Sequence, residues 1–218
     1  MDLQTLTKQC APAKILAVSK LQPEDRIRAL YAQGQRQFGE NYVQEALEKI
    51  QHLQDLQIEW HLIGSLQKNK AKFVVGQFAL IHSVDSLELA EVLSRQCVNK
   101  KVSQNILLQV NVAHEDSKGG FTPNAVKSLW GQLTELPQIH IQGFMTMPPL
   151  TETGAEVRPY FMELRHLRDE LKTKTNLSVH SLQELSMGTS HDYPVAIEEG
   201  ATIVRLGTIL FGERPMKR

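Results

Sequence analysis

Short apolar runs alternate with segments of helical periodicity along almost the whole sequence, and this alternation restricts the possible folds more than any other feature. Each apolar run has the length of a strand, and in the stretch that follows it apolar residues recur at helical spacing. About eight such units fit into the 218 residues, at roughly 27 residues each. Strict alternation of this kind predicts a parallel sheet covered by helices.

The strands are assigned from composition and length, and the helices from spacing. The predicted strands span residues 15–20, 36–40, 58–63, 78–82, 105–111, 139–145, 179–185 and 202–206. Helices are expected from residue 23 up to Gly34 and over 42–53, 68–75, 86–98, 123–133 and 159–173, and a helical pattern follows each of the last two strands. The strongest strand is 105–111, because it is nearly continuously apolar, as a buried parallel strand should be.

Two α/β architectures share this local pattern: a closed (β/α)8 barrel of the TIM type and a doubly wound open sheet. Periodicity alone does not separate them, and we favour the barrel. The sequence contains no internal repeat, no low-complexity segment and no Gly/Ser-rich linker. A single domain over residues 1–218 is therefore expected.

Charge and cysteine content exclude several classes of protein. The 24 Lys and Arg residues balance 24 Asp and Glu residues, so no net field draws the chain to nucleic acid or to an anionic membrane. Cys10 and Cys97 lack the spacing of a metal site or of a disulfide framework, which is typical of a reducing compartment. Residues 1–13 lack the apolar centre of a signal peptide, and no apolar run is long enough to span a bilayer. We therefore expect a cytoplasmic protein that binds neither nucleic acid nor membranes.

Two segments near the C-terminus have the composition of phosphate-binding loops. Residues 186–190 (Ser-Met-Gly-Thr-Ser) and 204–208 (Val-Arg-Leu-Gly-Thr) each end an apolar run in glycine and hydroxyl residues, where backbone N–H groups can point at an anion. The loops after the last two strands of a (β/α)8 barrel often bind phosphate. A Gly-Thr pair after a strand is also a common turn, so composition alone leaves both interpretations open.

Strand alternation directs two charged residues toward the same place. Leu16 and Lys20 share one face of the first strand, so Lys20 would lie inside the mouth of a barrel if Leu16 points inward. A partly desolvated lysine there would favour its neutral, nucleophilic form, although a solvated lysine at a strand end is the alternative. Arg205 and Gly207 share a face of the last strand, and a buried arginine either forms an ion pair or touches a ligand.

Other polar residues at strand ends are ambiguous when taken one by one. Asn41 follows the second strand and could supply a polar side chain to the mouth or cap the next helix. His61 and Asn111 could bind a ligand or be satisfied polar groups of the core. No dinucleotide-binding, P-loop, zinc-protease or serine-hydrolase motif occurs, and no pair of clusters has complementary metal spacing, so no metal site is expected.

Several segments give a more specific signal together than any of them gives alone. They are Ala17-Val18-Ser19-Lys20, residues 38–45 (Phe-Gly-Glu-Asn-Tyr-Val-Gln-Glu), residues 60–70 (Trp-His-Leu-Ile-Gly-Ser-Leu-Gln-Lys-Asn-Lys), Ser186-Met187-Gly188 and residues 204–212 (Val-Arg-Leu-Gly-Thr-Ile-Leu-Phe-Gly). In this order, from about Ile15 to Pro215, they resemble the pyridoxal phosphate homeostasis protein family. The sequence departs from that family at Thr189, where methionine is more usual, and in a short N-terminus, which leaves the usual leading helix in question.

The resemblance implies a modified TIM barrel like the N-terminal domain of alanine racemase, with pyridoxal 5′-phosphate (PLP) bound at the C-terminal ends of the strands. Lys20 would hold PLP as an aldimine, and Arg205 would lie beneath the cofactor ring. The other implied binding residues are Ser186, Gly188, Gly207 and Thr208 at the phosphate, and Asn41, His61 and Met145 in the pocket wall.

The function implied is that of a carrier that holds PLP reversibly and takes part in vitamin B6 and amino-acid homeostasis, without robust catalysis. Apo forms of PLP enzymes are candidate acceptors, and a monomer is expected. The alternative is an amino-acid racemase, but such enzymes take a second base from an additional β domain of a partner subunit, for which residues 213–218 leave no room. An arginine facing the pyridine nitrogen would also weaken the electron sink that racemisation needs. A phosphate-binding barrel that contacts a protein partner without PLP is a third interpretation.

Overall fold

The computed structural model describes residues 2–113, 115 and 119–212, so residues 213–215 of the stretch discussed above lie outside it. Within the described residues, eight parallel strands close into a barrel in which each strand pairs with the next and β8 pairs with β1. The strands are β1 (Lys14–Val18), β2 (Gln37–Glu40), β3 (Glu59–Leu62), β4 (Leu80–Val84), β5 (Gln104–Gln109), β6 (Ile139–Met145), β7 (Glu184–Thr189) and β8 (Ile203–Leu206). The predicted closed barrel is confirmed, and the open sheet is excluded.

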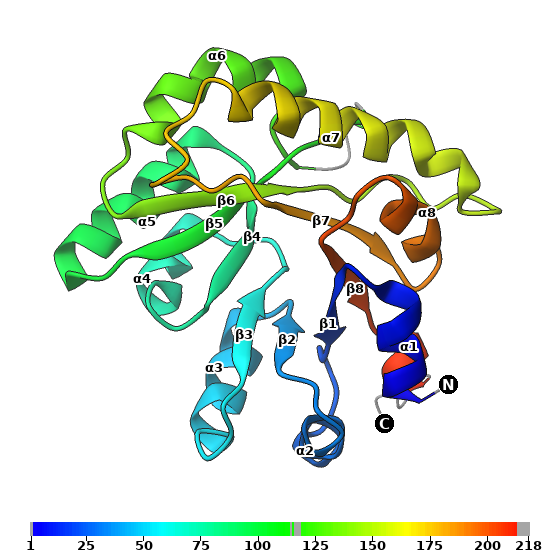
Figure 1. The fold of residues 1–218 in the computed structure, drawn as a ribbon. Coiled ribbons are helices and arrows are strands. Elements are labelled where there is room, and N and C mark those ends of the chain that lie inside the picture. Colours follow the sequence, from blue (N-terminus) through cyan, green and yellow to red (C-terminus); the bar gives the residue numbers. More distant parts are fainter. Residues whose placement is uncertain (1, 114, 116–118, 213–218) are drawn as a thin grey trace.

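Helices connect the strands and lie outside the barrel. Figure 1 shows α5, α6 and α7 along one side of the sheet and α1 and α8 beside β1 and β8. The helices are α1 (Leu3–Cys10), α2 (Glu24–Ala32), α3 (Val43–His52), α4 (Ala71–Val74), α5 (Leu87–Lys100), α6 (Pro123–Thr134), α7 (Arg158–Lys172), α8 (Tyr193–Glu198) and α9 (Thr208–Phe211), with 3-10 turns η1 (Lys68–Lys70) and η2 (Ala155–Val157). In the part of the chain that the structure describes, no helix has the length and apolar character needed to cross a bilayer.

Two apolar clusters distinguish the outer face of the barrel from its interior. The larger cluster packs the helices onto the strands and includes Ile15 and Ala17 of β1. The smaller cluster consists of Leu16, Leu80, Leu107, Met145 and Ile203, each from a different strand. Because neighbouring residues of β1 fall into different clusters, the smaller cluster fills the barrel interior. Leu16 points inward, as the prediction for Lys20 requires.

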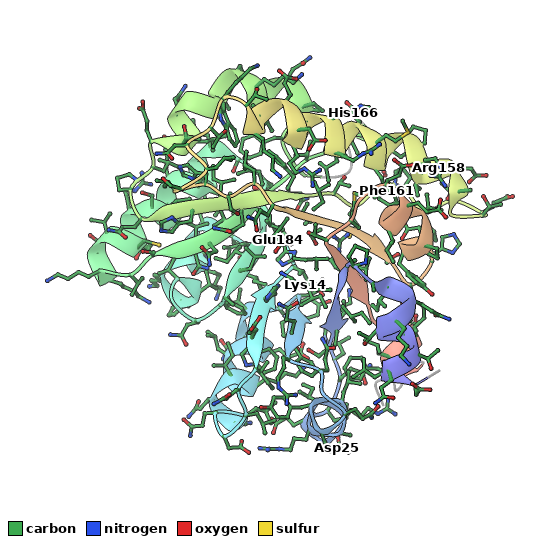
Figure 2. All side chains as sticks on the ribbon, in the orientation of Figure 1. Lys14, Asp25, Arg158, Phe161, His166 and Glu184 are labelled. Carbon is green, nitrogen blue, oxygen red and sulfur yellow. The ribbon has the colours of Figure 1, made fainter. Side chains whose placement is uncertain are left out.

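An ion pair lies at the N-terminal end of the barrel. Nζ of Lys14, the first residue of β1, lies 2.9 Å from Oε1 of Glu184, the first residue of β7, and Figure 2 shows both side chains near the centre of the view. The hydroxyl of Thr202 donates to Oε2 of Glu184 at 2.5 Å. The loops after the strands gather at the opposite, C-terminal end, where barrel enzymes place their sites.

The seventh strand begins later than predicted. The apolar pattern placed it at 179–185, whereas β7 spans Glu184–Thr189. The segment before it is a connection, because Nδ1 of His180 accepts a backbone N–H of β6 at 3.1 Å and Leu182 has a left-handed φ of 46°. As a consequence Ser186 lies inside a strand and not in the loop that follows it.

A helix precedes β1, although the short N-terminus left it in question. Asp2 caps α1, since its carboxylate accepts the Thr5 N–H at 2.8 Å. Leu3, Leu6 and Cys10 are buried at helical spacing. Both the capping residue and the apolar spacing are visible in the sequence, so this helix could have been predicted.

Candidate functional site

The C-terminal ends of the strands bring together residues from distant parts of the sequence. Lys20 lies in the turn after β1, Asn41 directly after β2, and Gly207 and Thr208 directly after β8. Because β1 pairs with β2 on one side and with β8 on the other, the Lys20 turn lies between the other two loops. A Cβ atom built on Gly207 would lie 3.7 Å from Cβ of Val18, which confirms that the loop after β8 reaches the end of β1.

A cavity of 230 Å³ lies at this end of the barrel. It is lined by Asn41, Ile63, Gly64, Ser65, Gln109, Val110, Asn111, Gly119, Met145, Met147 and Arg205. Three predicted site residues, Asn41, Met145 and Arg205, therefore meet in one cavity. A hollow of 350 Å³ between α6 and α7 contains none of the predicted site residues, so the site is assigned to the barrel mouth.

The two asparagines of the cavity wall differ in their hydrogen bonding. Asn111 donates from its side chain to the carbonyl of Glu115 at 2.8 Å and accepts the Glu115 N–H at 3.2 Å, so it shapes a turn. Oδ1 of Asn41 is buried and has no hydrogen-bond partner among the described residues. Buried acceptors are nearly always paired in folded proteins, so an unpaired one in a cavity wall fits a ligand that donates to it.

Arg205 is a buried cation at the floor of the cavity, with only 5% of its surface exposed. Its Nη1 donates to the carbonyl of Ser186 at 2.6 Å and to the Ser186 hydroxyl at 2.8 Å, and its Nη2 donates to the carbonyl of Thr146 at 2.8 Å. Burial lowers its pKa to about 10, against an opposing effect of Asp192. The guanidinium thus stays charged at neutral pH, and three hydrogen bonds fix its plane.

A chain of hydrogen bonds runs from Arg205 into the barrel interior. Oγ of Ser186 lies 2.9 Å from Nδ1 of His82, and Nε2 of His82 lies 2.9 Å from Nδ1 of His61. Arginine can only donate, so the Ser186 hydroxyl accepts from it and gives its own proton to His82. His82 must then carry its proton on Nε2 and donate to His61.

Both histidines of this chain are held neutral. Burial lowers the pKa of His61 to about 3, with a further contribution from the positive charge of Lys14. Burial also lowers the pKa of His82 well below its usual value, and the neighbouring His61 and Arg205 act in the same direction. Protonating either ring would put a donor where the chain needs an acceptor, so the electrostatics and the hydrogen-bond geometry agree.

Two predicted site residues, His61 and Ser186, lie below the cavity and do not line it. His61 is 3% exposed and Ser186 is fully buried. The hydroxyl of Ser186 is already shared between Arg205 and His82, so in this arrangement it supports the guanidinium. Direct contact of either residue with a ligand stays a prediction. The position of Ser186 favours an indirect role, in which it supports the Arg205 guanidinium.

Ser190 is a further candidate, which was not among the binding residues expected from the sequence. It follows the end of β7, and its Oγ accepts the backbone N–H of Gly207 at 3.4 Å, so it joins the loops after β7 and β8. Thr189 beside it turns away, because its N–H and hydroxyl both bind the Asp192 carboxylate, at 2.6 and 2.9 Å. A correct end for the strand would have identified Ser190, since hydroxyl residues just beyond a barrel strand are the ones that face the mouth.

The predicted glycines serve different purposes. A Cβ on Gly188, whose φ is +89°, would lie 2.6 Å from Cβ of Ala196, so this glycine allows α8 to pack on β7. Gly207 has space beside it and precedes α9, whose first backbone N–H groups lack acceptors within the helix. Together with the Thr208 and Ser190 hydroxyls, these N–H groups form a set of donors suited to a phosphate. Among the described residues, this set and Lys20 lie beside the 230 Å³ cavity and do not line it.

The fold and this mouth define the class of protein. Residues 2–215 match the family model described as "Alanine racemase, N-terminal domain". The chain therefore belongs to that family of (β/α)8 barrels. The likeness extends to an alanine racemase from Corynebacterium glutamicum, with a TM-score of 0.75 over 96% of this chain and 58% of the racemase. At 16% sequence identity, that comparison shows a shared fold alone.

Closer relatives identify the branch of the family. The chain is 49% identical over 202 residues to the "Pyridoxal phosphate homeostasis protein" of Aquifex aeolicus, covering 93% of this chain and 87% of the relative. It is 42% identical over 211 residues to the protein of the same name from Pseudomonas aeruginosa, covering 97% and 89%. The chain belongs to the pyridoxal phosphate homeostasis protein family.

A solved structure of a relative supports this assignment. PipY of Synechococcus elongatus PCC7942, without PLP, is 44% identical and superposes with a TM-score of 0.91 over 96% of this chain and 98% of PipY. The same protein with PLP bound superposes with a TM-score of 0.89 at 43% identity.

Proposed function

We propose that this protein binds PLP reversibly at the barrel mouth and acts in the homeostasis of PLP, and through it of amino acids. One observation carries the proposal: the mouth combines a lysine at the end of β1, phosphate-type donors after β7 and β8, and a buried arginine in the adjoining cavity. The names of the relatives and the PLP complex of PipY support it.

Each part of the ligand would meet a different group of the mouth. When bound, PLP supplies two groups: an aldehyde, which reacts with amines, and a phosphate dianion. Lys20 provides the amine, and we assign the phosphate to Ser190, Thr208 and the backbone at Gly207, in the loops after β7 and after β8, the strand that pairs with β1. We assign Arg205 to the ring nitrogen and the unpaired Oδ1 of Asn41 to a donor of the ligand.

The cavity wall favours binding over catalysis. Among the described residues that line it, none is a carboxylate, a histidine or a tyrosine, so it offers no side chain of the kinds that usually act as a second acid or base. Arg205 can only donate hydrogen bonds, and a cation at the ring nitrogen disfavours protonation of the ring. We therefore propose that the protein is a carrier and that the racemase alternative does not hold.

The first prediction follows from the role of Lys20. Purified protein given PLP and then reduced with borohydride should carry the label on Lys20, and Lys20→Ala should abolish the labelling. Peptide mapping after reduction identifies the lysine that reacted. Lys70 lies in the neighbouring groove between α3 and α4, so Lys70→Ala is the matched control and should be labelled on Lys20 as in the wild-type protein. A label on Lys70 in the wild-type protein would refute the assignment.

Cellular location and oligomeric state are proposals as well. The two cysteines, Cys10 and Cys97, are buried and unpaired, which fits a reducing compartment such as the cytoplasm. Apo forms of PLP enzymes are the proposed acceptors. A monomer is also proposed, and light scattering at micromolar concentration tests it.

A further inference from the structure

A buried cluster of charged residues lies directly under the turn that carries Lys20. It consists of Glu40 at the end of β2 and of Glu45 and Lys49 in α3. Nζ of Lys49 lies 2.8 Å from Oε1 of Glu40 and 2.7 Å from Oε1 of Glu45. The Lys49 side chain is 7% exposed and that of Glu40 is fully buried, so these two charges are shielded from solvent, whereas Glu45 at the edge of the cluster is 24% exposed.

The cluster binds the chain on both sides of Lys20. Before it, Ser19 donates from its hydroxyl to Oε1 of Glu40 at 2.7 Å, and the Ser19 carbonyl accepts from Nζ of Lys49 at 2.7 Å. After it, the N–H of Leu21 donates to Oε1 of Glu45 at 2.6 Å. Lys20 is thus the one residue between two anchored neighbours.

The conformation of this turn needs such anchoring. Leu21 has a φ of 60°, a left-handed conformation that side-chain-bearing residues rarely adopt. Such backbone persists where the surroundings over-determine it, and it is concentrated at functional sites. Buried ion pairs are also a weak source of stability, because desolvation offsets much of their attraction. Holding one lysine turn in a set geometry is therefore a more fitting role for this cluster than stabilising the core.

We propose that Glu40, Glu45 and Lys49 are positioning residues that fix the direction in which the Lys20 side chain leaves the end of β1. They thereby set the rate at which the Lys20 amine condenses with the aldehyde, a step that forms a C=N bond and releases the aldehyde oxygen as water. This inference rests on the proposed function, in which Lys20 is the attachment point. The three residues act through the hydroxyl and carbonyl of Ser19 and the N–H of Leu21, and no contact of theirs with the ligand is required. The structural prediction is that weakening the cluster slows covalent capture without weakening the pocket.

The experiment uses the full-length protein and separates three quantities. Hydrogen exchange of the Leu21 amide reports whether the turn is anchored, in protein freed of ligand. The rate of borohydride-trapped capture of PLP on Lys20 reports reactivity. The dissociation constant of 4-deoxypyridoxine 5′-phosphate, which has the phosphate and the ring but no aldehyde, reports the pocket alone.

We expect Lys49→Met and Glu45→Ala to speed exchange of Leu21 and to slow capture on Lys20 by about tenfold, since small displacements of a reacting group have effects of this order. Affinity for the aldehyde-free analogue should change less than about twofold. Lys49→Arg and Glu45→Gln keep a donor and an acceptor in place and should restore most of the rate. Lys127→Met, which breaks an exposed ion pair with Glu170 on α6 and α7, is the control and should change none of the three.

The outcomes are distinct. Capture at the wild-type rate in variants whose Leu21 exchanges fast would overturn the positioning role, and so would a parallel loss of capture and analogue affinity. Glu45→Ala leaves the pair between Lys49 and Glu40 in place, so it serves as the test where Lys49→Met fails to fold. Capture on a lysine other than Lys20 in the wild-type protein would refute the proposed function itself, and the positioning role with it.

Discussion

At the scale of single residues, Ser186 and Ser190 belong to one phosphate-like stretch of sequence but lie in different surroundings. The Ser186 hydroxyl is enclosed between Arg205 and His82 inside the barrel. The Ser190 hydroxyl lies at the mouth beside the N–H of Gly207. We infer that Ser190 contributes to the phosphate site and that Ser186 holds the guanidinium of Arg205 in place.

Ser190→Ala should weaken the binding of PLP and leave that of pyridoxal, which lacks the phosphate, nearly unchanged. A hydrogen bond to a charged group contributes about 1.5–3 kcal/mol, so the loss should be roughly tenfold to a hundredfold. Thr208→Val should behave in the same way. Spectroscopic titration with both compounds measures the two dissociation constants.

Ser186→Ala is the contrasting variant in that titration. It removes one acceptor of Arg205 and the donor to His82, so it should weaken the binding of PLP and of pyridoxal to a similar extent. A selective loss of PLP binding in Ser186→Ala, with none in Ser190→Ala, would return the phosphate role to Ser186.

Strand alternation in the sequence was sufficient to direct Lys20 and Arg205 toward the barrel mouth, because side chains two residues apart share a face. It could not reveal the bond between His82 and Ser186. These residues lie 104 positions apart and meet only because their strands face each other across the closed barrel. Contacts of this kind depend on strand register, which periodicity leaves open.

At the scale of elements, close approach of two strands depends on Gly143 in β6. Its φ is +149°, and a Cβ atom there would lie 1.9 Å from the carbonyl oxygen of Glu184 at the start of β7. Gly143→Ala should therefore lower the free energy of unfolding by more than about 2 kcal/mol, since backbone must move to make room. Urea unfolding measures the change.

Gly131 provides the matched control for that substitution. It lies within α6, and a Cβ atom built on it meets nothing within 4 Å. Gly131→Ala should raise stability by about 0.5–1 kcal/mol, because alanine loses less backbone entropy in a helix. Equal changes in the free energy of unfolding at the two positions would show that close approach of β6 and β7 does not require glycine at position 143.

The element order was predictable from the sequence, and the ends of elements were less so. β6 was predicted with its bounds, because its apolar run is clearly delimited. The predicted start of β7 was too early, because Val179 and Leu182, which extended the apolar pattern, belong to a connection held by His180. Closure of the barrel could not be derived from periodicity, because an open sheet has the same local pattern and the pairing of β8 with β1 is a long-range property.

At the scale of the whole molecule, the two buried histidines make stability depend on pH. His61 has a pKa lowered to about 3 by burial and by Lys14, and the pKa of His82 is lowered by burial, by His61 and by Arg205. In the unfolded chain a histidine has a pKa of about 6.5. Below that value the unfolded state binds more protons than the folded state, so stability is fully present above about pH 6.5 and is lost as the pH falls toward the folded pKa.

We expect His61 alone to contribute a loss of about 2 kcal/mol in the free energy of unfolding between about pH 7.5 and about pH 5. His82 should add to it in the same direction. Urea unfolding across this range measures the slope, and His61→Asn should make it shallower. An unchanged slope in His61→Asn would mean that His61 is not neutral in the folded barrel.

A carrier must release the PLP that it holds, so its attachment to Lys20 has to be reversible. A bond between Lys20 and an aldehyde can be exchanged with other amines. Protein loaded with PLP should therefore reactivate an apo PLP enzyme, while L-alanine incubated with it should not racemise at an enzyme-like rate. Reactivation is measured in two arrangements: with the two proteins mixed, and with the two separated by a membrane that passes PLP but not protein. Comparing the two distinguishes transfer on contact from release into solution. Lys20→Ala is the control and should deliver far less PLP. Racemisation that requires Lys20, without any delivery of PLP, would instead show that the protein is an enzyme and not a carrier.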